Sequence, residues 1–372
     1  MVSVGEESGR PTWAEIDLGA LARNLRAVRG LAQGRRVIAV VKANAYGHGA
    51  VAVSSALERE GADMLAVATV EEARELRLGG IRLPLLLLEG LHDPGDADVL
   101  LPLNLVPLIG RIESLAPLEG AARRAGRPLP VHLKIDTGMG RLGLLPDELG
   151  GVFEVLRGSV LELEGIATHL SEADDGDSTA TDSQRRRFED AVQSARASGF
   201  EPAWIHADPS AGLVHGPTRV STAVRPGILL YGPDPTLEGG HGLEGVMTLV
   251  TRVIRAKDLP PGSRIGYGGT YVTSVASRIL TVPVGYADGL PRSAGGRVEL
   301  GLGDRLVPLV GRVSMDLATL DAGPGSNAEV GEEVLIFGRR GGLELRVEKI
   351  AAATDTISYE ILVRVGARVP RV

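Results

Sequence analysis

Residues 37–43 read VIAVVKA, so five consecutive apolar residues lead directly into a lysine, Lys42. An apolar run without polar alternation is typical of a strand that is buried on both faces of a parallel sheet. Residues 50–60 (AVAVSSALERE) follow with charge on one face of a helical pattern, and residues 64–68 (MLAVA) form a second apolar run. This stretch therefore predicts a β-α-β unit.

The same alternation continues through the first two-thirds of the chain. With the two runs above, eight strands are predicted; the other six are residues 83–88, 103–106, 131–136, 163–169, 203–207 and 222–225. Helical patterns such as residues 70–78 and 184–197 lie between them. Eight such units in about 200 residues predict an α/β fold, an N-terminal (β/α)8 TIM-like barrel. A doubly wound open sheet is the alternative that the pattern leaves open.

The pattern changes near residue 245. Short β-rich runs, separated by Gly, Pro and Asp, occur at residues 246–253, 278–284, 306–310 and 333–337. Only residues 347–354 look helical. We therefore predict the barrel over residues 11–245 and a C-terminal, mostly antiparallel β domain over residues 246–372.

Composition excludes several classes of protein. The chain has no cysteine, so disulfides and thiolate metal sites are excluded, and we expect no metal site. A net charge of −7 argues against a nucleic-acid partner. The longest apolar run, residues 83–88, is too short to span a bilayer, and the N-terminus lacks the features of a signal peptide. A cytoplasmic protein with neither membrane nor nucleic-acid partners is expected.

Polar residues stand at the ends of the predicted strands, where barrel enzymes carry their chemistry. Lys42 must be desolvated or paired after its apolar run, and a neutral amine can condense with an aldehyde; a lysine that reaches out to solvent is the alternative. Ser210 and the segment 225–228 (RPGI) offer a hydroxyl and backbone N–H groups that can hold a phosphate. Alone this segment is a weak signal, because Pro-Gly is usually a turn.

Residues 39–49 (AVVKANAYGHG) resemble the cofactor-lysine signature of alanine racemases. Similar stretches follow in the order of that family: residues 134–143 (KIDTGMGRLG), 168–169 (TH), 224–228 (VRPGI), 231–232 (YG), 266–271 (GYGGTY), 285–289 (GYADG), 311–316 (GRVSMD), 359–360 (YE) and 368–371 (RVPR). The resemblance runs from about Trp13 to the C-terminus. One departure is Pro209, where the family commonly has an asparagine before the serine that contacts phosphate.

The resemblance implies a pyridoxal-phosphate enzyme of fold type III that interconverts L- and D-alanine and supplies D-alanine for peptidoglycan. Lys42 is expected to hold the cofactor covalently and to act as the base for the D-isomer. Tyr267 is expected to be the base for the L-isomer. Two bases on opposite faces suit racemisation, because neither has to cross the plane of the reacting carbon. Relatives form head-to-tail homodimers, so Tyr267 and Met315 of each site are expected to come from the partner chain.

The family's other site residues are carried over in the same way. Arg225 is expected to contact the pyridine nitrogen of the cofactor, and His169 to support Arg225. Arg141 is expected to clamp the substrate carboxylate, and Lys134, often carbamylated in relatives, to orient it. The phosphate set is Tyr46, Ser210, Gly227, Ile228 and Tyr359; Met315 is a substrate contact, and Tyr286 narrows the entrance.

Alternatives remain at this point. A basic amino-acid decarboxylase of the same fold commonly uses a cysteine, which this chain lacks, and a glutamate in place of Arg225. A non-catalytic pyridoxal-phosphate carrier would lack a β domain with Tyr267. A racemase of serine or of broader specificity stays open, although Tyr286 and Tyr359 keep bulk at the alanine site. Arg225 could be a surface arginine, and Lys134 could form an ordinary surface pair with Asp136.

Overall fold

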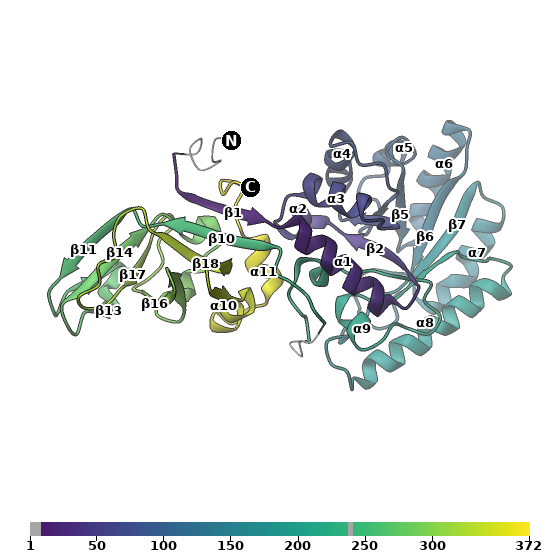
Figure 1. Ribbon diagram of the computed structural model, residues 1–372. Coiled ribbons are helices and arrows are strands. Elements are labelled where there is room, and N and C mark those ends of the chain that lie inside the picture. Colours follow the sequence, from purple (N-terminus) through teal and green to yellow (C-terminus); the bar gives the residue numbers. More distant parts are fainter. Residues whose placement is uncertain (1–8, 237–240) are drawn as a thin grey trace. The chain divides into compact units, whose positions relative to one another are not determined.

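The computed structural model describes residues 9–236 and 241–372 (Figure 1). Its described residues form two compact units. The barrel unit comprises residues 21–45 and 50–243, and the β unit comprises the residues up to Ala20, residues 46–49 and residues 244–372. The domain limits expected from the sequence stay a prediction, because compact units need not coincide with domains.

Eight parallel strands form the sheet of the barrel unit, in the order β8-β7-β6-β5-β4-β3-β2-β9 among the described residues. They are β2 (Arg36–Val40), β3 (Met64–Val67), β4 (Leu85–Leu87), β5 (Leu105–Ile109), β6 (Leu129–Lys134), β7 (Leu161–Ala167), β8 (Trp204–His206) and β9 (Ala223–Val224). The last strand pairs with the first, and Thr222 N donates to Ile205 O at 2.8 Å beside the gap between β8 and β9. The ring is therefore nearly closed, which confirms the barrel and excludes the open sheet.

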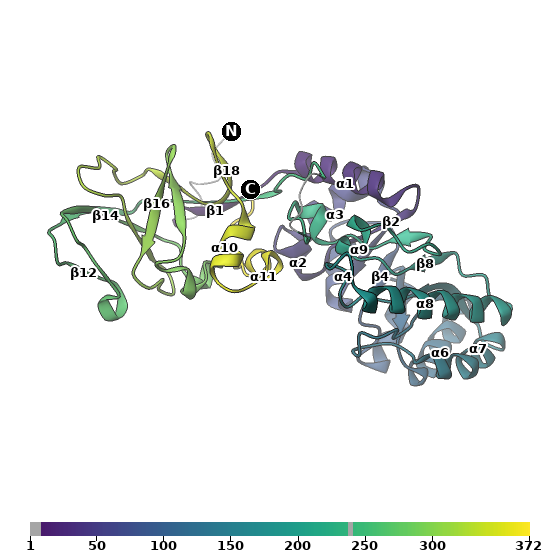
Figure 2. The same ribbon diagram turned by 90° about the horizontal axis from the view of Figure 1, so that it is seen from below.

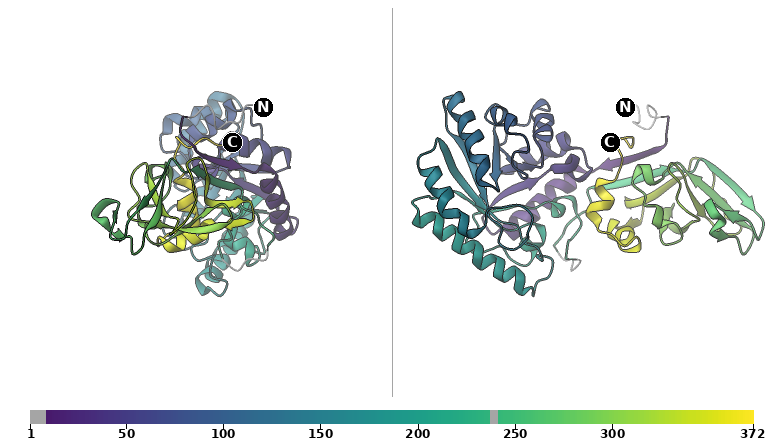
Figure 3. Two further views of the ribbon diagram at one scale, coloured as in Figure 1. Left: turned by 60° about the vertical axis from the view of Figure 1, so that its left-hand side comes forward. Right: turned by 180° about the vertical axis from the view of Figure 1, so that it is seen from behind.

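Helices cover the outside of these strands (Figures 1 and 3). They are α1 (Leu18–Ala32), α3 (Ala50–Arg59), α4 (Val70–Leu78), α5 (Ala97–Leu100), α6 (Leu115–Ala125), α7 (Leu149–Arg157), α8 (Thr179–Ala197) and α9 (Ser210–Val214). Helix α8 buries Phe188, Val192 and Ala195, which share one face because they are four and three residues apart. Its first turn is capped by Ser178, whose hydroxyl accepts from Thr181 N.

The β unit contains an antiparallel sheet in the order β1-β10-β18-β15-β16-β17-β14-β11, with β19 paired to β18 (Figure 2). Its strands are β1 (Thr12–Ile16), β10 (Met247–Arg252), β11 (Arg255–Leu259), β14 (Ser277–Val282), β15 (Glu299–Leu302), β16 (Arg305–Val310), β17 (Ala318–Asp321), β18 (Glu333–Arg340) and β19 (Leu343–Leu345). A smaller pair is formed by β12 (Arg264–Ile265) and β13 (Tyr271–Val272). The predicted antiparallel β fold is confirmed.

Three details differ from the sequence prediction. Strand β2 ends at Val40, before Lys42, because the chain turns into the left-handed segment α2 (Lys42–Tyr46). Strand β5 runs through Pro107 to Ile109, since Leu108 and Ile109 still pair with β6. The β unit has a second helix, α11 (Ser358–Val363), after α10 (Val347–Ala353); at six residues it is too short to show a helical period.

Candidate active site

The end of strand β2 is fixed from both sides in the barrel unit. Val41 N donates to Ala66 O at 2.9 Å, and Val40 N donates to Pro226 O at 3.0 Å in the segment after β9. The buried hydroxyl of Tyr231 donates to Val40 O at 2.9 Å. Lys42 follows at this anchored end and is half-buried.

Lys42 is followed by four non-glycine residues in the left-handed region. The φ angles of Ala43, Asn44, Ala45 and Tyr46 are 53°, 55°, 51° and 53°. Asparagine tolerates this conformation, whereas alanine and tyrosine visit it at an energetic cost. Ala45 N donates to Val41 O at 2.8 Å, and the Asn44 side chain accepts from Ala50 N at 2.7 Å. The turn is therefore held by specific contacts and not by a glycine.

Arg225 is a buried cation, with 6% of its surface exposed. Its guanidinium donates to the carbonyl groups of Thr168, His206 and Ala207 at 2.5, 2.6 and 3.0 Å. It also contacts Nδ1 of His206 at 2.7 Å and Nδ1 of His169 at 3.3 Å. Burial lowers the pKa of Arg225 to about 10, so it stays protonated at neutral pH. This environment excludes the surface-arginine alternative.

Arg225 begins a chain of hydrogen bonds that runs through residues of strands β8, β6 and β7. Nε2 of His206 lies 2.9 Å from Nδ1 of His132, and Nε2 of His132 lies 3.3 Å from the Glu164 carboxylate. Because arginine can only donate, Nδ1 of His206 must accept, and its Nε2 must then donate to His132. His132 in turn donates to Glu164. Burial lowers the pKa of both histidines, most strongly that of His206, so both rings are neutral.

Positive charge gathers around His169 at the barrel mouth. Burial and the charges of Arg225, Lys134, Arg141 and Lys42 lower the pKa of His169 to about 3. Neutral His169 therefore stands among two arginine and two lysine side chains. Such a site suits a ligand that carries phosphate and carboxylate groups.

Burial, with Arg225 as the next cause, lowers the pKa of Lys134 to about 7. The Asp136 carboxylate accepts instead from the N–H groups of Gly138, Met139 and Gly140. Within the described ranges Lys134 and Asp136 form no ion pair, which argues against the surface-pair alternative. Arg141 is exposed and forms no ion pair with any described residue, so its guanidinium is available to a substrate.

A second part of the site surrounds Ser210. Its buried hydroxyl oxygen accepts from Gly227 N at 2.9 Å and from Leu229 N at 3.4 Å. In the described part of the chain, no acceptor takes the hydrogen of this hydroxyl. A buried hydroxyl donor beside the backbone N–H group of Ile228 fits a phosphate oxygen.

Pro209 does not disturb this segment. The neighbouring Asp208 carboxylate is buried and accepts from Thr218 N at 3.0 Å, from the Thr218 hydroxyl at 2.6 Å and from the Ser221 hydroxyl at 2.9 Å. Asp208 O accepts from Arg225 N at 2.9 Å. The loop is therefore held by Asp208, and the missing N–H and side-chain amide of residue 209 leave Ser210 in place.

The remaining predicted site residues belong to the β unit. The rings of Tyr46 and Tyr359 lie 6.0 Å apart, and burial raises the pKa of Tyr46, so its phenol stays a donor. Tyr267 is 70% exposed in a turn between two glycines with positive φ. Met315 and Tyr286 are also exposed. The backbone joins the two segments that carry them, because Tyr286 N donates to Ser314 O at 3.1 Å.

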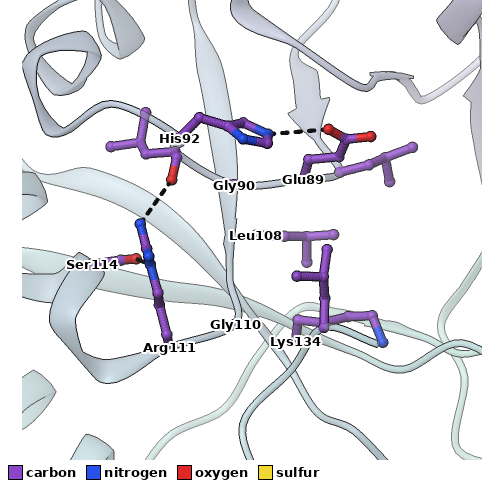
Figure 4. A pocket seen from close by; sticks show the side chains of 11 residues that line it. Glu89, Gly90, His92, Leu108, Gly110, Arg111, Ser114 and Lys134 are labelled. Atoms are coloured by element: carbon purple, nitrogen blue, oxygen red, sulfur yellow. Dashed lines mark hydrogen bonds and ion pairs between the residues drawn. The ribbon is translucent and has the colours of Figure 1, made fainter. Parts of the chain in front are cut away.

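A pocket of about 220 Å³ opens at the carboxyl ends of β4, β5 and β6 in the barrel unit (Figure 4). Figure 4 shows Glu89 and His92 on one side and Lys134 on the other, with Leu108 between them. His92 contacts Glu89 at 3.1 Å. Half-buried Lys134 therefore lines a space large enough for a small molecule.

One group of the predicted site residues lies together in the barrel unit. The barrel unit gathers Lys42, Lys134, Arg141, His169, Ser210, Arg225, Gly227 and Ile228. Sequence reasoning missed the roles of His132, Glu164 and Asp208. Two histidines in strands that are otherwise apolar were the available signal for the buried chain, since such residues need a buried partner.

No helix in residues 9–236 or 241–372 is both long and apolar enough to cross a membrane. The same described residues contain no cluster of three His, Cys, Asp or Glu side chains that could hold a metal ion.

Two family models together match most of this chain. The alanine racemase N-terminal domain matches residues 16–235, and the alanine racemase C-terminal domain matches residues 246–372. The chain belongs to the alanine racemase family. Among curated members, the alanine racemase of Symbiobacterium thermophilum is 43% identical over 97% of this chain and 97% of its own length. That of Clostridium tetani is 37% identical over 98% and 95%.

Solved structures of alanine racemases share the fold. The enzyme from Streptomyces lavendulae, a D-cycloserine producer, has a TM-score of 0.93 at 34% identity, over 98% of this chain and 97% of that one. The Bacillus anthracis alanine racemase, solved with bound L-Ala-P, has a TM-score of 0.89 at 33% identity, over 98% and 95%. The family resemblance seen in the sequence is confirmed.

Proposed function

We propose that this chain interconverts L- and D-alanine with pyridoxal phosphate as its cofactor and with Lys42 and Tyr267 as the two bases. The observation that carries the proposal is the gathering of Lys42 with buried Arg225 and neutral His169 at one end of the barrel. The alanine racemase family to which the chain belongs supplies the reaction class.

The residues present fit the cofactor. Lys42 would hold its aldehyde carbon, and the Ser210 hydroxyl with the N–H groups of Gly227 and Ile228 would bind its phosphate. Tyr46 and Tyr359 would complete the phosphate site, with neutral Tyr46 as a donor. When bound, the pyridoxal ring withdraws electrons from the Cα–H bond of the amino acid.

Arg225 limits how strongly that withdrawal acts. Its pKa of about 10 keeps it protonated, and five carbonyl and imidazole acceptors hold its guanidinium. A guanidinium that keeps its proton offers a hydrogen bond to the ring nitrogen without protonating it. Burial lowers the pKa of His169 to about 3, so at neutral pH it accepts from Arg225 and adds no charge of its own.

The substrate would be held by its carboxylate. Arg141 is exposed and without an ion pair among the described residues, and its planar fork suits a carboxylate. Lys134, with a pKa of about 7, is half neutral near physiological pH, and a neutral amine can take up carbon dioxide. We infer that Lys134 is carbamylated and that the new negative charge orients Arg141.

Tyr267 would exchange the proton on the face opposite Lys42, with Met315 as a substrate contact and Tyr286 narrowing the entrance. The exposure of Tyr267, 70%, supports a role against a second surface. We infer a homodimer in which the partner chain supplies Tyr267 and Met315, because a two-fold pairing gives two equal shared sites.

We further propose that the enzyme works in the cytoplasm and supplies D-alanine for peptidoglycan. The test of the function is racemase activity of purified protein with added pyridoxal phosphate, measured by chiral chromatography on L-alanine, L-serine and L-lysine. L-alanine should be converted to an equal mixture of isomers and serine at a rate at least tenfold lower. Comparable rates on serine, or none on alanine, would contradict the proposal.

A further inference from the structure

The carboxylate of Glu72 joins two segments of the barrel unit. Its Oε1 accepts from Ala43 N and its Oε2 accepts from Ala68 N, each at 2.7 Å. Glu72 lies in the first turn of α4, where its own N–H donates to the Thr69 hydroxyl at 3.3 Å. Each carboxylate oxygen therefore holds one backbone N–H, in two different loops.

The contact with Ala43 matters because of where that N–H lies. Ala43 follows Lys42 directly, and its peptide is the first of the left-handed run with φ near 53°. Non-glycine residues stay in this region only when their surroundings hold them there. The Glu72 carboxylate therefore restrains the peptide that sets the direction of the Lys42 side chain.

The Glu72 carboxylate binds these backbone N–H groups and not a cationic side chain. Within the described ranges it forms no ion pair with a lysine, arginine or histidine. Hydrogen bonds to an ionised carboxylate are stronger than neutral ones, and this carboxylate makes two short ones. Its neighbour Glu71 is exposed at the same helix end and makes no contact with Ala43, so proximity to the helix terminus alone does not explain the geometry.

A helix cap accounts for only half of the arrangement. The Thr69 hydroxyl caps the start of α4 by accepting from Glu72 N, and the Glu72 carboxylate accepts from Ala68 N, one residue before the N-cap. The bond to Ala43 lies outside that motif and reaches a different strand end. One carboxylate thus links the start of α4 to the turn that follows β2.

We propose that Glu72 is a positioning residue that fixes the left-handed turn after Lys42 and so directs the lysine amine toward the aldehyde carbon of the cofactor. This inference rests on the proposed function of Lys42 as the cofactor lysine. The inference predicts that loss of the hydrogen bond to Ala43 N slows the reaction of the Lys42 amine with an aldehyde, even when that aldehyde carries no phosphate.

The experiment measures the rate of covalent attachment of pyridoxal, which lacks the phosphate, to cofactor-free protein by visible absorbance. Glu72→Ala removes both contacts, and Glu72→Gln keeps one acceptor oxygen. Thr69→Ala weakens the same helix cap without touching Ala43, and Glu71→Gln removes a neighbouring charge. We expect Glu72→Ala to slow attachment at least tenfold and Glu72→Gln about threefold to tenfold, with both controls within twofold of wild type.

A second measurement separates an effect on the direction of the Lys42 amine from an effect on the stability of the fold. For the same variants loaded with pyridoxal phosphate, Glu72→Ala should lower kcat for L-alanine with little change in KM, while Thr69→Ala lowers only the thermal midpoint. Attachment by both Glu72 variants at the wild-type rate would overturn the inference, as would an equal slowing in Thr69→Ala. If Glu72→Ala does not fold, the attachment rate of Glu72→Gln alone tests the inference. Failure of wild type to attach pyridoxal at Lys42 would instead refute the proposed function.

Discussion

Arg225 donates to Nδ1 of His206 at 2.7 Å, and this one contact sets the direction of the hydrogen bonds from Arg225 to Glu164. Both intervening histidines are neutral and carry their proton on Nε2, because the arginine cannot accept. Within the barrel unit the positive charge of Arg225 is thus linked through two imidazoles to the Glu164 carboxylate.

Replacing His206 with phenylalanine should therefore weaken both fold and catalysis. Arg225 would lose one acceptor and His132 one donor, and an unsatisfied buried polar group costs about 1–3 kcal/mol. We expect the free energy of unfolding, measured in urea, to fall by about that amount and kcat to fall at least tenfold. His92→Phe, at an exposed site, is the control. An unchanged kcat in His206→Phe would mean that Arg225 does not depend on this chain.

The low pKa of His169 predicts a pH dependence of stability. The unfolded chain takes up a proton near pH 6.5, whereas folded His169 does so only near pH 3, so folding is penalised as pH falls through this window. The free energy of unfolding should fall by up to about 1.4 kcal/mol per pH unit between 6.5 and 3 from this residue. His169→Gln should reduce that slope in urea unfolding of cofactor-free protein. An identical slope of the free energy of unfolding against pH in wild type and in His169→Gln would contradict the assignment of His169 as neutral.

Lys134 should be the most reactive free lysine at neutral pH. The chain has four lysines, and Lys257 and Lys349 are exposed. An ordinary lysine titrates near 10.4, whereas Lys134 does so near 7, so about half of its amine is neutral at pH 7. With ¹³C-bicarbonate at pH 7 to 8, NMR should show one carbamate signal per chain that Lys134→Ala removes and Lys257→Ala keeps. A signal that survives Lys134→Ala would refute this assignment.

Subunit mixing tests the shared site. Lys42→Ala and Tyr267→Ala should each be inactive alone. In a mixed dimer one site would carry both lesions and the other neither, so activity should return to at most half of the wild-type level per heterodimer. Native mass spectrometry verifies that subunits have exchanged. Exchange without recovered activity would place Lys42 and Tyr267 of one site in the same chain.

Much of the barrel could be predicted because its strands are buried on both faces and so read as apolar runs. The turn after Lys42 could not, since nothing in the composition of Ala43 and Ala45 signals a left-handed backbone. Strand β1 pairs with β10 far along the sequence, so no local pattern reveals its partner. Residues at strand ends, such as Lys42 and Arg225, could be found from position. His132 shows only that a polar residue in an apolar strand needs a buried partner, and Glu164 carries no signal of its own.

The assignment of Lys42 is tested most directly by borohydride reduction of the protein loaded with pyridoxal phosphate, followed by peptide mass mapping. Lys134 is a stringent internal competitor, because burial lowers the pKa of its amine to about 7. We expect the cofactor mass on the peptide that contains Lys42 and on no other. Cofactor fixed on Lys134, or spread over several lysines, would contradict the account.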